Sequence, residues 1–443
     1  MKKLITLCLA LAGMVGTVSA AKLYIENADP TNWTDIDVYA WEEANTVTNH
    51  NVWNIDHDAL STVELYGTTW YVFEMTNNWN RAIVRGNSSN WDDYKTSNLT
   101  VESDLYITVV GHDVYRRNYV YPVFRSDLDN NWDSDIENAT AENAFTFYRE
   151  YTKSTIDTWA SNNSRSNFSF RFKAGYDFGG GFWPQIYPNS VNAELPIGST
   201  LNSSYENTEN TTYCWQVSIP SYDYEKIRLT AAYRKVDGDW KWQISADAYF
   251  SKTVYADNGY ATFGTSVPVD LSGLSAKGVT AYTVTADATS RVITKNKKSD
   301  ALDANEGVLL QNTSGYDVTL SIPVAASAEA SASNSMVAFT GTERLTQPTS
   351  GNETYYILAN NEGDGVGFYK VNTTSGNAMG ANTAYLKVTG SLARPYLWFD
   401  EATGIDAVES AKPDGEAYNL AGQRVAQPTK GLYIVNGKKV IMK

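Results

Sequence analysis

Cysteine and histidine are scarce in this chain, whose 443 residues include 2 cysteines and 3 histidines. Cys8 lies inside an apolar N-terminal run, too early to be the acylated cysteine of a lipoprotein, and its removal with that run leaves Cys214 alone. An internal disulfide is therefore excluded, and we expect Cys214 to lie in a core. The histidines, His50, His57 and His112, lack the spacing of metal ligands. We expect no metal and no cofactor.

Basic residues are also few. The chain has 35 Lys plus Arg and 50 Asp plus Glu, which gives a net charge of −15. A chain of this charge, with no basic stripe to compensate locally, repels a polyphosphate backbone. Nucleic acid is therefore not an expected partner. The charged fraction of 19% is low, and Asn, Thr, Ser and Tyr fill the gap, as is typical of secreted β-proteins.

Long apolar runs are absent after the N-terminus. The first residues combine Lys2-Lys3, an apolar run from Leu4 to Val18 and the small residues Ser19-Ala20, which is the pattern of a secretory signal peptide over residues 1–20. We expect cleavage after Ala20. No later segment approaches the ~18 consecutive apolar residues of a membrane helix, so we expect no membrane span.

Recognisable catalytic motifs are missing as well. The chain has no Glu-x-Asp-x-x-Glu strand motif, no Gly-x-Ser-x-Gly elbow and no phosphate-binding loop, and it has no room for an α/β barrel of about 250 residues. We therefore predict a protein that is not an enzyme. A glycoside hydrolase site within residues 114–250 stays open as an alternative, because 50 acidic residues supply carboxylate pairs throughout the chain.

Alternation of apolar and polar residues, which is typical of β-strands, is frequent in this chain. Residues 35–41 and 104–109 alternate with period two between Asn, Gly, Asp and Ser clusters, as in a β-sandwich. Of 13 tryptophans, 12 lie between Trp33 and Trp242, which marks a change of character in the later chain. We predict an all-β fold of tandem β-sandwich modules, with a short helix around residues 141–158. The expected parts after the signal peptide are a β-sandwich at 22–110, a second at 114–250, a β-rich accessory module at 259–400 and a C-terminal tail at 404–443.

The segment from Trp33 to Trp41 predicts a strand with two unlike faces, because alternate residues of a strand point to opposite sides. One face is apolar, and the other places aromatic rings among carboxylates, which indicates a solvated surface. Exposed rings on a rigid sheet suit the apolar faces of pyranose rings, so a sugar is the expected ligand. The alternative is that Tyr39 and Trp41 lie under a loop or at a domain interface. The apolar face holds Ile36, Val38 and Ala40, and the other holds Trp33, Asp35, Asp37, Tyr39 and Trp41.

The strand from Trp240 to Phe250 gives the opposite prediction. Its large apolar residues share one face, and polar residues occupy the other, so these tryptophans are expected in a core. The apolar set is Trp240, Trp242, Ile244, Ala246, Ala248 and Phe250, opposite Lys241, Gln243 and Ser245.

The N-terminal segment contains the motifs Leu23-Tyr24-Ile25-Glu26-Asn27, Trp33, Val38-Tyr39-Ala40-Trp41, Trp53, Trp70-Tyr71-Val72-Phe73, Asn98-Leu99-Thr100-Val101 and Leu105-Tyr106. Together these motifs resemble carbohydrate-binding module family 26, a family of starch-binding β-sandwiches. The resemblance covers residues 22–109, about a fifth of the chain. It implies recognition of α-1,4-glucan by Tyr39, Trp41 and Trp53, with polar support from Lys95 and Asn98. The sequence departs from the family pattern where Trp-Pro-Gly is frequent, because Asn54-Ile55 follows Trp53 here.

The second module more faintly resembles accessory domains of outer-membrane starch-binding proteins, through Asn131-Trp132, Phe172-Lys173-Ala174-Gly175 and Gly179-Gly180-Gly181-Phe182-Trp183. This suggests a second glucan site at Trp132 and Trp183, against the alternative of a Gly-rich hairpin with buried aromatics. Within the module, acidic and amide residues alternate like calcium-loop ligands, but Trp132 replaces the turn glycine and Asn138 the bidentate glutamate, so a solvated acidic loop is the favoured prediction. The alternating residues are Asp127, Asp129, Asn131, Asp133 and Asp135.

The tail resembles the C-terminal sorting domain of type IX secretion, through residues 417–425 and 430–440. The likeness implies passage through the outer membrane of a Gram-negative bacterium to the cell surface or beyond. An ordinary C-terminal hairpin is the alternative. The sequence as a whole predicts non-catalytic binding of starch or maltooligosaccharides at the cell surface, with outer-membrane glycan-uptake proteins as further partners. A structural or adhesion protein without sugar binding is the alternative function.

Overall fold

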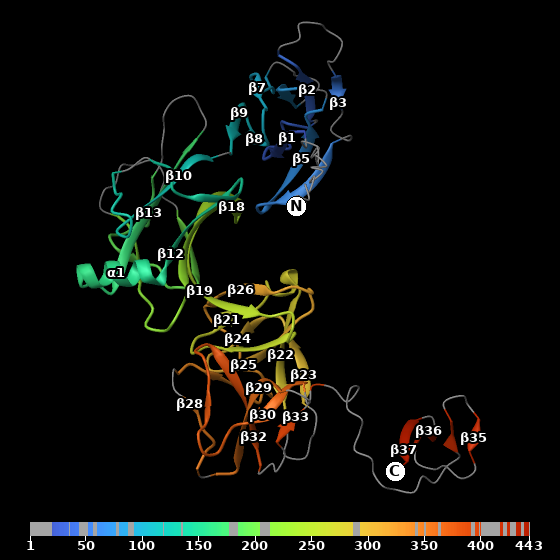
Figure 1. Cartoon of the computed structure of the whole chain (residues 1–443). Coiled ribbons are helices and arrows are strands. Elements are labelled where there is room, and N and C mark those ends of the chain that lie inside the picture. Colours follow the sequence, from blue (N-terminus) through green and yellow to red (C-terminus); the bar gives the residue numbers. More distant parts are fainter. Residues whose placement is uncertain are drawn as a thin grey trace, which may run out of the picture. The chain divides into compact units, whose positions relative to one another are not determined.

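Figure 1 shows the computed structural model of the chain, which divides into two compact units. Unit 1 comprises Met1–Ile219 and Lys226–Asp247, and unit 2 comprises Pro220–Glu225 and Ala248–Lys443. The expected signal peptide lies outside the described residues, apart from Ala20. The structure describes residues 20–34, 36–43, 52–55, 60–76, 79–86, 93–117, 119–133, 136–176, 185–203, 213–286, 293–341, 344–349, 351–361, 365–390, 395–397, 399, 417–419, 423–425, 431–435 and 438–442.

The fold is all-β, as predicted. Among the described residues, one α-helix and one short 3₁₀ helix, η2 (Ser275–Lys277), interrupt a series of strands. No helix in this part of the chain has the length and apolar character needed to cross a membrane.

The first β-sandwich of unit 1 packs two sheets around one core. Its apolar centre is formed by alternate residues of facing strands, including Leu23 and Ile107 from one sheet and Val38 and Val84 from the other. This alternation is what period-two sequence dictates. One sheet has the order β4-β5-β1-β8-β9, and the other β3-β2-β6-β7. The strands are β1 (Lys22–Asn27), β2 (Asp37–Trp41), β3 (Val52–Ile55), β4 (Ser61–Leu65), β5 (Thr68–Glu74), β6 (Arg81–Arg85), β7 (Leu99–Thr100), β8 (Leu105–Val110) and β9 (Asp113–Arg116).

The second part of unit 1 has two further sheets with the orders β10-β13-β17-β15 and β11-β12-β18-β19-β16, and β14 adds to β13. Phe168, Phe170 and Phe172 are fully buried along β13, and Phe172 contacts Trp242 of β19 at 4.9 Å between ring centroids. The strands are β10 (Tyr119–Ser126), β11 (Thr140–Asn143), β12 (Thr146–Thr152), β13 (Asn167–Tyr176), β14 (Gln185–Ile186), β15 (Ala193–Glu194), β16 (Ser199–Ser203), β17 (Trp215–Ser218), β18 (Lys226–Val236) and β19 (Asp239–Val254).

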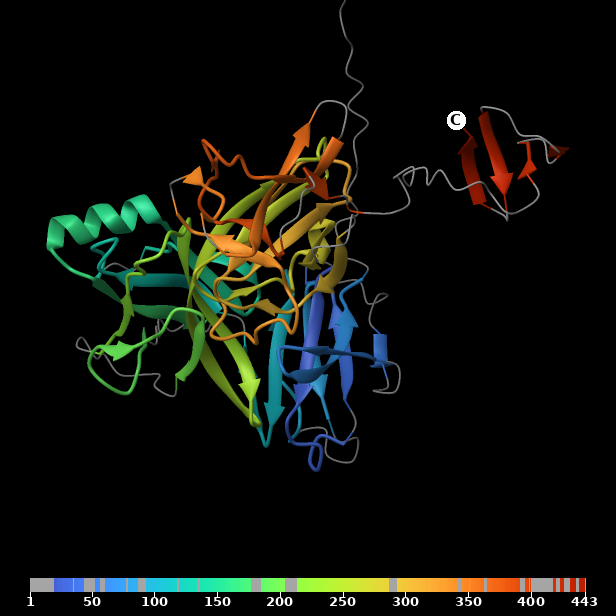
Figure 2. The ribbon, with the colours of Figure 1, turned by 90° about the horizontal axis from the view of Figure 1, so that it is seen from below.

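The predicted helix exists but begins later than expected. Residues 140–143 and 146–152 are strands, and α1 covers Lys153–Asn163. Thr152 caps the helix by accepting a hydrogen bond from the Thr155 N–H, and Ser164 ends it in the left-handed conformation. Ile156 is its buried residue. Figures 1 and 2 both show α1 at the outer edge of this part of unit 1.

Unit 2 is also built from antiparallel sheets. Its main core lies between sheets β20-β25-β22-β23 and β27-β32-β29-β30-β33, where Leu309, Tyr356, Phe368 and Leu386 are fully buried. Pairs β21-β24 and β28-β31 complete it, β26 pairs with residues 249–254 of β19, and β35-β34-β36-β37 form a small sheet in the tail. The strands are β20 (Tyr260–Gly264), β21 (Val269–Asp270), β22 (Val279–Thr285), β23 (Thr294–Lys298), β24 (Ala301–Leu302), β25 (Gly307–Asn312), β26 (Val318–Pro323), β27 (Met336–Phe339), β28 (Arg344–Leu345), β29 (Glu353–Asn361), β30 (Gly365–Lys370), β31 (Asn377–Ala378), β32 (Thr383–Thr389), β33 (Tyr396–Leu397), β34 (Ala417–Tyr418), β35 (Arg424–Val425), β36 (Gly431–Val435) and β37 (Lys438–Met442).

Candidate carbohydrate-binding site

Strand β2 carries the predicted aromatic residues on the outer face of its sheet. Val38 and Ala40 are buried in the sandwich core, whereas Tyr39 and Trp41 are half-exposed on the opposite side. The alternation expected for these four residues is confirmed. Because β2 lies between β3 and β6, hydrogen bonds on both sides hold its backbone in place.

The two rings lie next to each other. Their centroids are 5.3 Å apart and their planes differ by 27°. This pair is called the aromatic platform below. The rings are stacked, so each turns part of one face toward the other, and the pair leaves its remaining ring surface on the outer side of a hydrogen-bonded strand.

The third predicted ring residue, Trp53, lies in the neighbouring strand. Val38 pairs with Ile55 and Ala40 with Val52, so Trp53 and Asn54 together lie opposite Tyr39 in a β-bulge. The backbone therefore brings Trp53 beside the aromatic platform, while its side chain is outside the described part of the structure.

Charged groups flank the aromatic platform on the β6 side. Arg81 pairs directly with Trp41 across the two strands, and its guanidinium donates hydrogen bonds to Glu43 and Thr100. Arg85, two rows further along the same face, forms a 2.8 Å ion pair with Asp37. Both arginines are therefore held by neighbouring acceptors at the edge of the aromatic surface.

The predicted polar residues reach the same sheet from a later segment. Lys95 pairs with Arg85, so Asp37, Arg85 and Lys95 follow one another across the strands on one face. Asn98 immediately precedes β7, which pairs with β6, and both Lys95 and Asn98 are exposed. The fold thus gathers residues from three separate parts of the sequence around the outer face of β2.

Trp33 does not belong to this surface, contrary to the sequence prediction. It precedes β2, is 1% exposed, and donates a 2.8 Å hydrogen bond from Nε1 to the Gly111 carbonyl. Its ring fills the core so closely that a Cβ added at Gly86 would lie 2.5 Å from the ring. The period-two pattern failed here because the residue lies before the strand. Asp35, assigned to the same face, lies outside the described residues.

The proposed second site of the later module is not assembled among the described residues. Trp132 is half-exposed, but its Nε1 donates to Asp127 at 3.1 Å and the Arg171 guanidinium lies 5.2 Å from its ring centroid. Trp183 and the glycines before it lie outside the described residues. Trp132 is therefore engaged with its own neighbours on both its polar atom and its ring.

The acidic residues that resembled a calcium loop accept hydrogen bonds from the protein. Asp127 accepts from the Ser169 N–H at 2.8 Å, and Asp129 accepts from the Tyr151 hydroxyl at 2.7 Å. The Asn131 amide donates to the Phe124 carbonyl and its oxygen accepts from the Ser126 N–H. Their oxygens are thus used to join the loop to β10, β12 and β13. Asp135 lies outside the described residues, as do His50 and His57.

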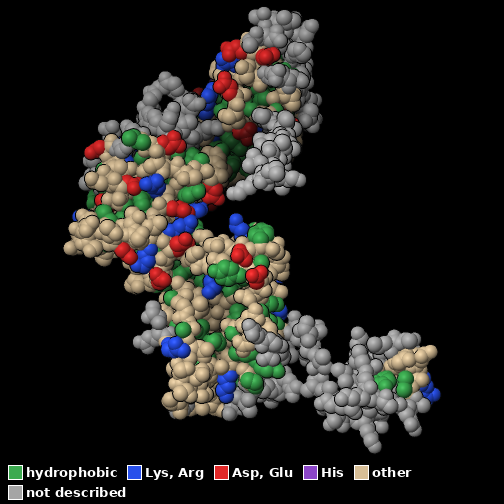
Figure 3. Space-filling view, viewed as in Figure 1, with side chains coloured by type: hydrophobic (Ala, Val, Ile, Leu, Met, Phe, Trp, Pro, Cys, Tyr) green, Lys and Arg blue, Asp and Glu red, His purple; other side chains and the backbone are tan. Residues whose placement is uncertain are grey.

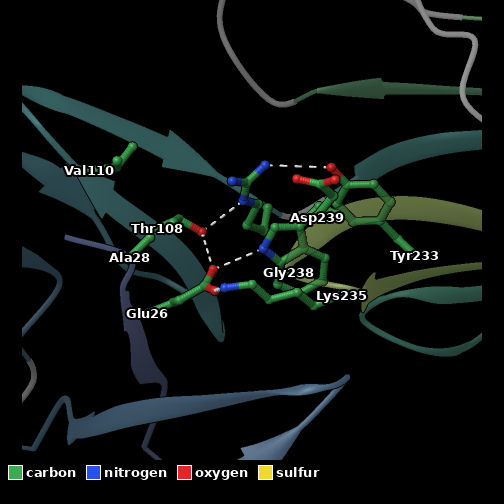
Figure 4. Close-up of a pocket in the computed structure, with 10 residues that line it drawn as sticks. Glu26, Ala28, Thr108, Val110, Tyr233, Lys235, Gly238 and Asp239 are labelled. Carbon is green, nitrogen blue, oxygen red and sulfur yellow. Dashed lines mark hydrogen bonds and ion pairs between the residues drawn. The ribbon is translucent and has the colours of Figure 1, made fainter. Parts of the chain in front are cut away.

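A polar pocket of about 450 Å³ lies where the first sandwich of unit 1 meets the β18–β19 hairpin (Figure 4). Its central group is Glu26, which is 2% exposed. The carboxylate accepts hydrogen bonds from the Lys235 ammonium, from Trp240 Nε1 at 2.9 Å and from the Thr108 hydroxyl at 2.6 Å. Burial alone raises the pKa of Glu26, but these hydrogen bonds outweigh it and hold that pKa below its ordinary value.

The other side chains that line the pocket also contact one another. Arg117 donates to Thr108 at 2.8 Å and lies 5.4 Å from the Trp240 ring centroid, while Tyr233 stacks against that ring at 5.0 Å. Neither the carboxylate nor the indole faces is left open for a ligand. The hydrogen bonds and ring contacts of these residues therefore hold the two parts of unit 1 together. The sequence analysis did not identify it, since a lone Glu in the period-two strand β1 carries no distinguishing signal.

Comparison with known proteins identifies no relative: no protein-family model, no curated protein and no solved structure matches this chain.

Proposed function

We propose that this chain binds starch or another α-1,4-glucan without catalysis, through the aromatic platform. The observation that carries the proposal is the pair of adjoining, half-exposed rings of Tyr39 and Trp41 on the outer face of a hydrogen-bonded strand. Pyranose rings present apolar C–H faces that pack on such surfaces.

The surrounding polar residues supply hydrogen bonds to sugar hydroxyls. Lys95 and Asn98 are exposed near the rings, and Arg81 is held in a fixed position beside Trp41. The backbone of β3 brings Trp53 beside the two rings. Because Arg81 is paired with Glu43 and Arg85 with Asp37, the site suits an uncharged ligand.

The proposal extends to the setting of the protein. An exported chain with the predicted signal peptide and sorting tail would hold glucan at the cell surface, where separate enzymes and glycan-uptake proteins act on it. This part of the proposal rests on the sequence motifs alone.

Affinity electrophoresis tests the binding. The chain from Ala21 onward is run in native gels with and without amylopectin, beside Tyr39→Ala, Trp41→Ala and Trp53→Ala. We expect the parent to be retarded by amylopectin and each substitution to weaken binding about fivefold, because one aromatic contact contributes roughly 1 kcal/mol. Tyr316→Ala is the matched control, since Tyr316 is 64% exposed in unit 2.

Three results would contradict the proposal. A folded parent that migrates equally in both gels would favour a structural or adhesion role. Retardation that survives both Tyr39→Ala and Trp41→Ala would place the glucan site elsewhere. Release of reducing sugar from soluble starch, measured in parallel, would favour the hydrolase alternative within residues 114–250.

A further inference from the structure

Trp159 on α1 differs from the other tryptophans whose side chains the structure describes. Its indole has no ring contact and its Nε1 has no hydrogen-bond acceptor within the described residues, although it is half-buried. The Trp159 N–H reaches solvent, so it is available to a ligand. The others each have a ring contact, an Nε1 hydrogen bond or both: Trp33, Trp41, Trp70, Trp79, Trp132, Trp215, Trp240 and Trp242.

This indole lines a pocket of about 490 Å³ beside the helix. The pocket residues on α1 are two adjacent pairs one turn apart and Asn162 one turn further on, so they form one stripe along the helix, and Leu128 lines this open pocket from the turn after β10. Asn162, one turn after Trp159, is exposed and its amide makes no hydrogen bond within the same described part of the chain. The lining residues are Leu128, Ser154, Thr155, Thr158, Trp159 and Asn162.

The pocket lining is uncharged. Its polar groups are hydroxyls and one amide, and the nearest charges on the helix, Lys153 and Asp157, pair with each other at 2.5 Å on the opposite side of α1. In Figure 3 the surface over α1 is mostly tan, the colour of uncharged polar side chains and backbone. A charged ligand would find no complementary charge here, which leaves a neutral polar one.

An aromatic face combined with hydroxyls and an amide is suited to one class of neutral ligand in particular. The indole offers a surface for the C–H face of a pyranose, while its N–H, the Asn162 amide and the threonine hydroxyls offer partners for sugar hydroxyls. Thr158 already donates to the Ser154 carbonyl at 2.8 Å, so its oxygen remains an acceptor.

We propose that this pocket is a separate binding site for a neutral saccharide, in which Trp159 stacks on a pyranose ring and Asn162 bonds its hydroxyls. It does not depend on the aromatic platform. Two sites on one chain would strengthen attachment to a polysaccharide, because the second contact forms at high effective concentration.

The test uses the full exported chain with the aromatic platform removed by Tyr39→Ala and Trp41→Ala, so that a second site is measured by itself. Maltoheptaose, cellohexaose and mannohexaose are titrated by isothermal calorimetry. We expect one of them to bind, with an affinity that added NaCl leaves unchanged. Adding Trp159→Ala should weaken that binding about tenfold or more, and Asn162→Ala several-fold.

Further variants separate binding from folding. Trp159→Phe keeps a ring at the position and should retain part of the affinity, and Asp157→Asn, on the opposite side of the helix, should retain all of it. Absence of binding to all three oligosaccharides would overturn the proposal. Binding that Trp159→Ala and Asn162→Ala both leave unchanged would also overturn it, since the site would then lie elsewhere.

Discussion

Glu26 accepts a 2.9 Å hydrogen bond from Trp240 Nε1, although the two residues lie 214 positions apart. The same carboxylate pairs with Lys235, which like Trp240 flanks the turn between β18 and β19. A second contact joins the same hairpin to the turn between β4 and β5, where the Tyr66 carbonyl accepts a 3.0 Å hydrogen bond from the Lys235 N–H. Unit 1 is therefore joined by two hairpin turns around one buried carboxylate.

Removal of the Glu26 side chain should be strongly destabilising. In Glu26→Ala the Lys235 ammonium and the Trp240 N–H lose their acceptor in a buried setting, so we expect a loss of about 3–5 kcal/mol in the free energy of unfolding. Urea unfolding followed by tryptophan fluorescence measures it. The control is Glu74→Ala, which breaks the exposed ion pair with Lys22 and should cost at most ~1 kcal/mol. Equal effects of the two substitutions would contradict this role of Glu26.

The same carboxylate should make stability depend on pH. Its folded pKa is lowered below the ordinary value of 4.5, so its contribution is fully present above that value and is lost as the pH falls through the folded pKa. Glu26→Gln should therefore flatten the decline in unfolding free energy at acid pH. Unfolding curves measured in steps below about pH 5 test this. An unchanged slope in Glu26→Gln would show that other carboxylates dominate.

Two glycines with nearly the same backbone angle provide a test of the turn contact. Gly67 and Gly238 have φ values of 86° and 85°, so Ala is strained at both. A Cβ at Gly67 would lie 2.5 Å from the Lys235 carbonyl oxygen, whereas one at Gly238 would have nothing within 4 Å. We expect Gly238→Ala to cost about 1 kcal/mol and Gly67→Ala about 1–3 kcal/mol more. Thermal unfolding of both variants measures the difference, and equal costs would mean that the turn moves freely.

Cys214 should react slowly with thiol reagents in the folded chain. It is buried, it donates to the Asn192 side chain at 3.1 Å, and burial raises the pKa of its thiol. Reaction requires the thiolate and access to solvent. We expect labelling with a coloured disulfide reagent to become fast only in denaturant, along the unfolding transition. Fast stoichiometric labelling of the native chain would contradict the buried placement.

The N-terminal cap of α1 offers a stability test for the helix that carries Trp159. Thr152→Ala removes the hydroxyl that accepts from the Thr155 N–H at 3.3 Å, and should cost about 1 kcal/mol. Ser161→Ala, on the exposed surface of the same helix, is the control and should change stability by at most ~0.5 kcal/mol. Circular dichroism during thermal unfolding compares the variants. Equal stabilities of Thr152→Ala and Ser161→Ala would show that the cap contributes nothing to the free energy of unfolding.

The period-two alternation of the sequence predicted side-chain burial reliably where a strand has one face in solvent and the other in the core. It predicted the buried Val38 and Ala40 beside the half-exposed Tyr39 and Trp41, and the buried run of Trp242, Ile244 and Phe250. Trp240, expected in that same core, is instead half-buried and lines the pocket around Glu26, to which its N–H donates. It failed at Trp33, which precedes its strand. It also failed along β8, where consecutive residues are buried because the outer face of that sheet packs against aromatic side chains from the next part of unit 1.

The sequence by itself determined the all-β class, the core faces of β2 and β19, and the burial of Cys214, because side-chain alternation and local hydrophobicity act over a few residues. Only the tertiary structure decided that Glu26 would meet Lys235 and Trp240, that Lys95 would lie beside Arg85 and Asp37, and that Trp159 would line an uncharged pocket. Such contacts depend on strand order and on how sheets pack, and residues far apart in the chain carry no local signal of one another.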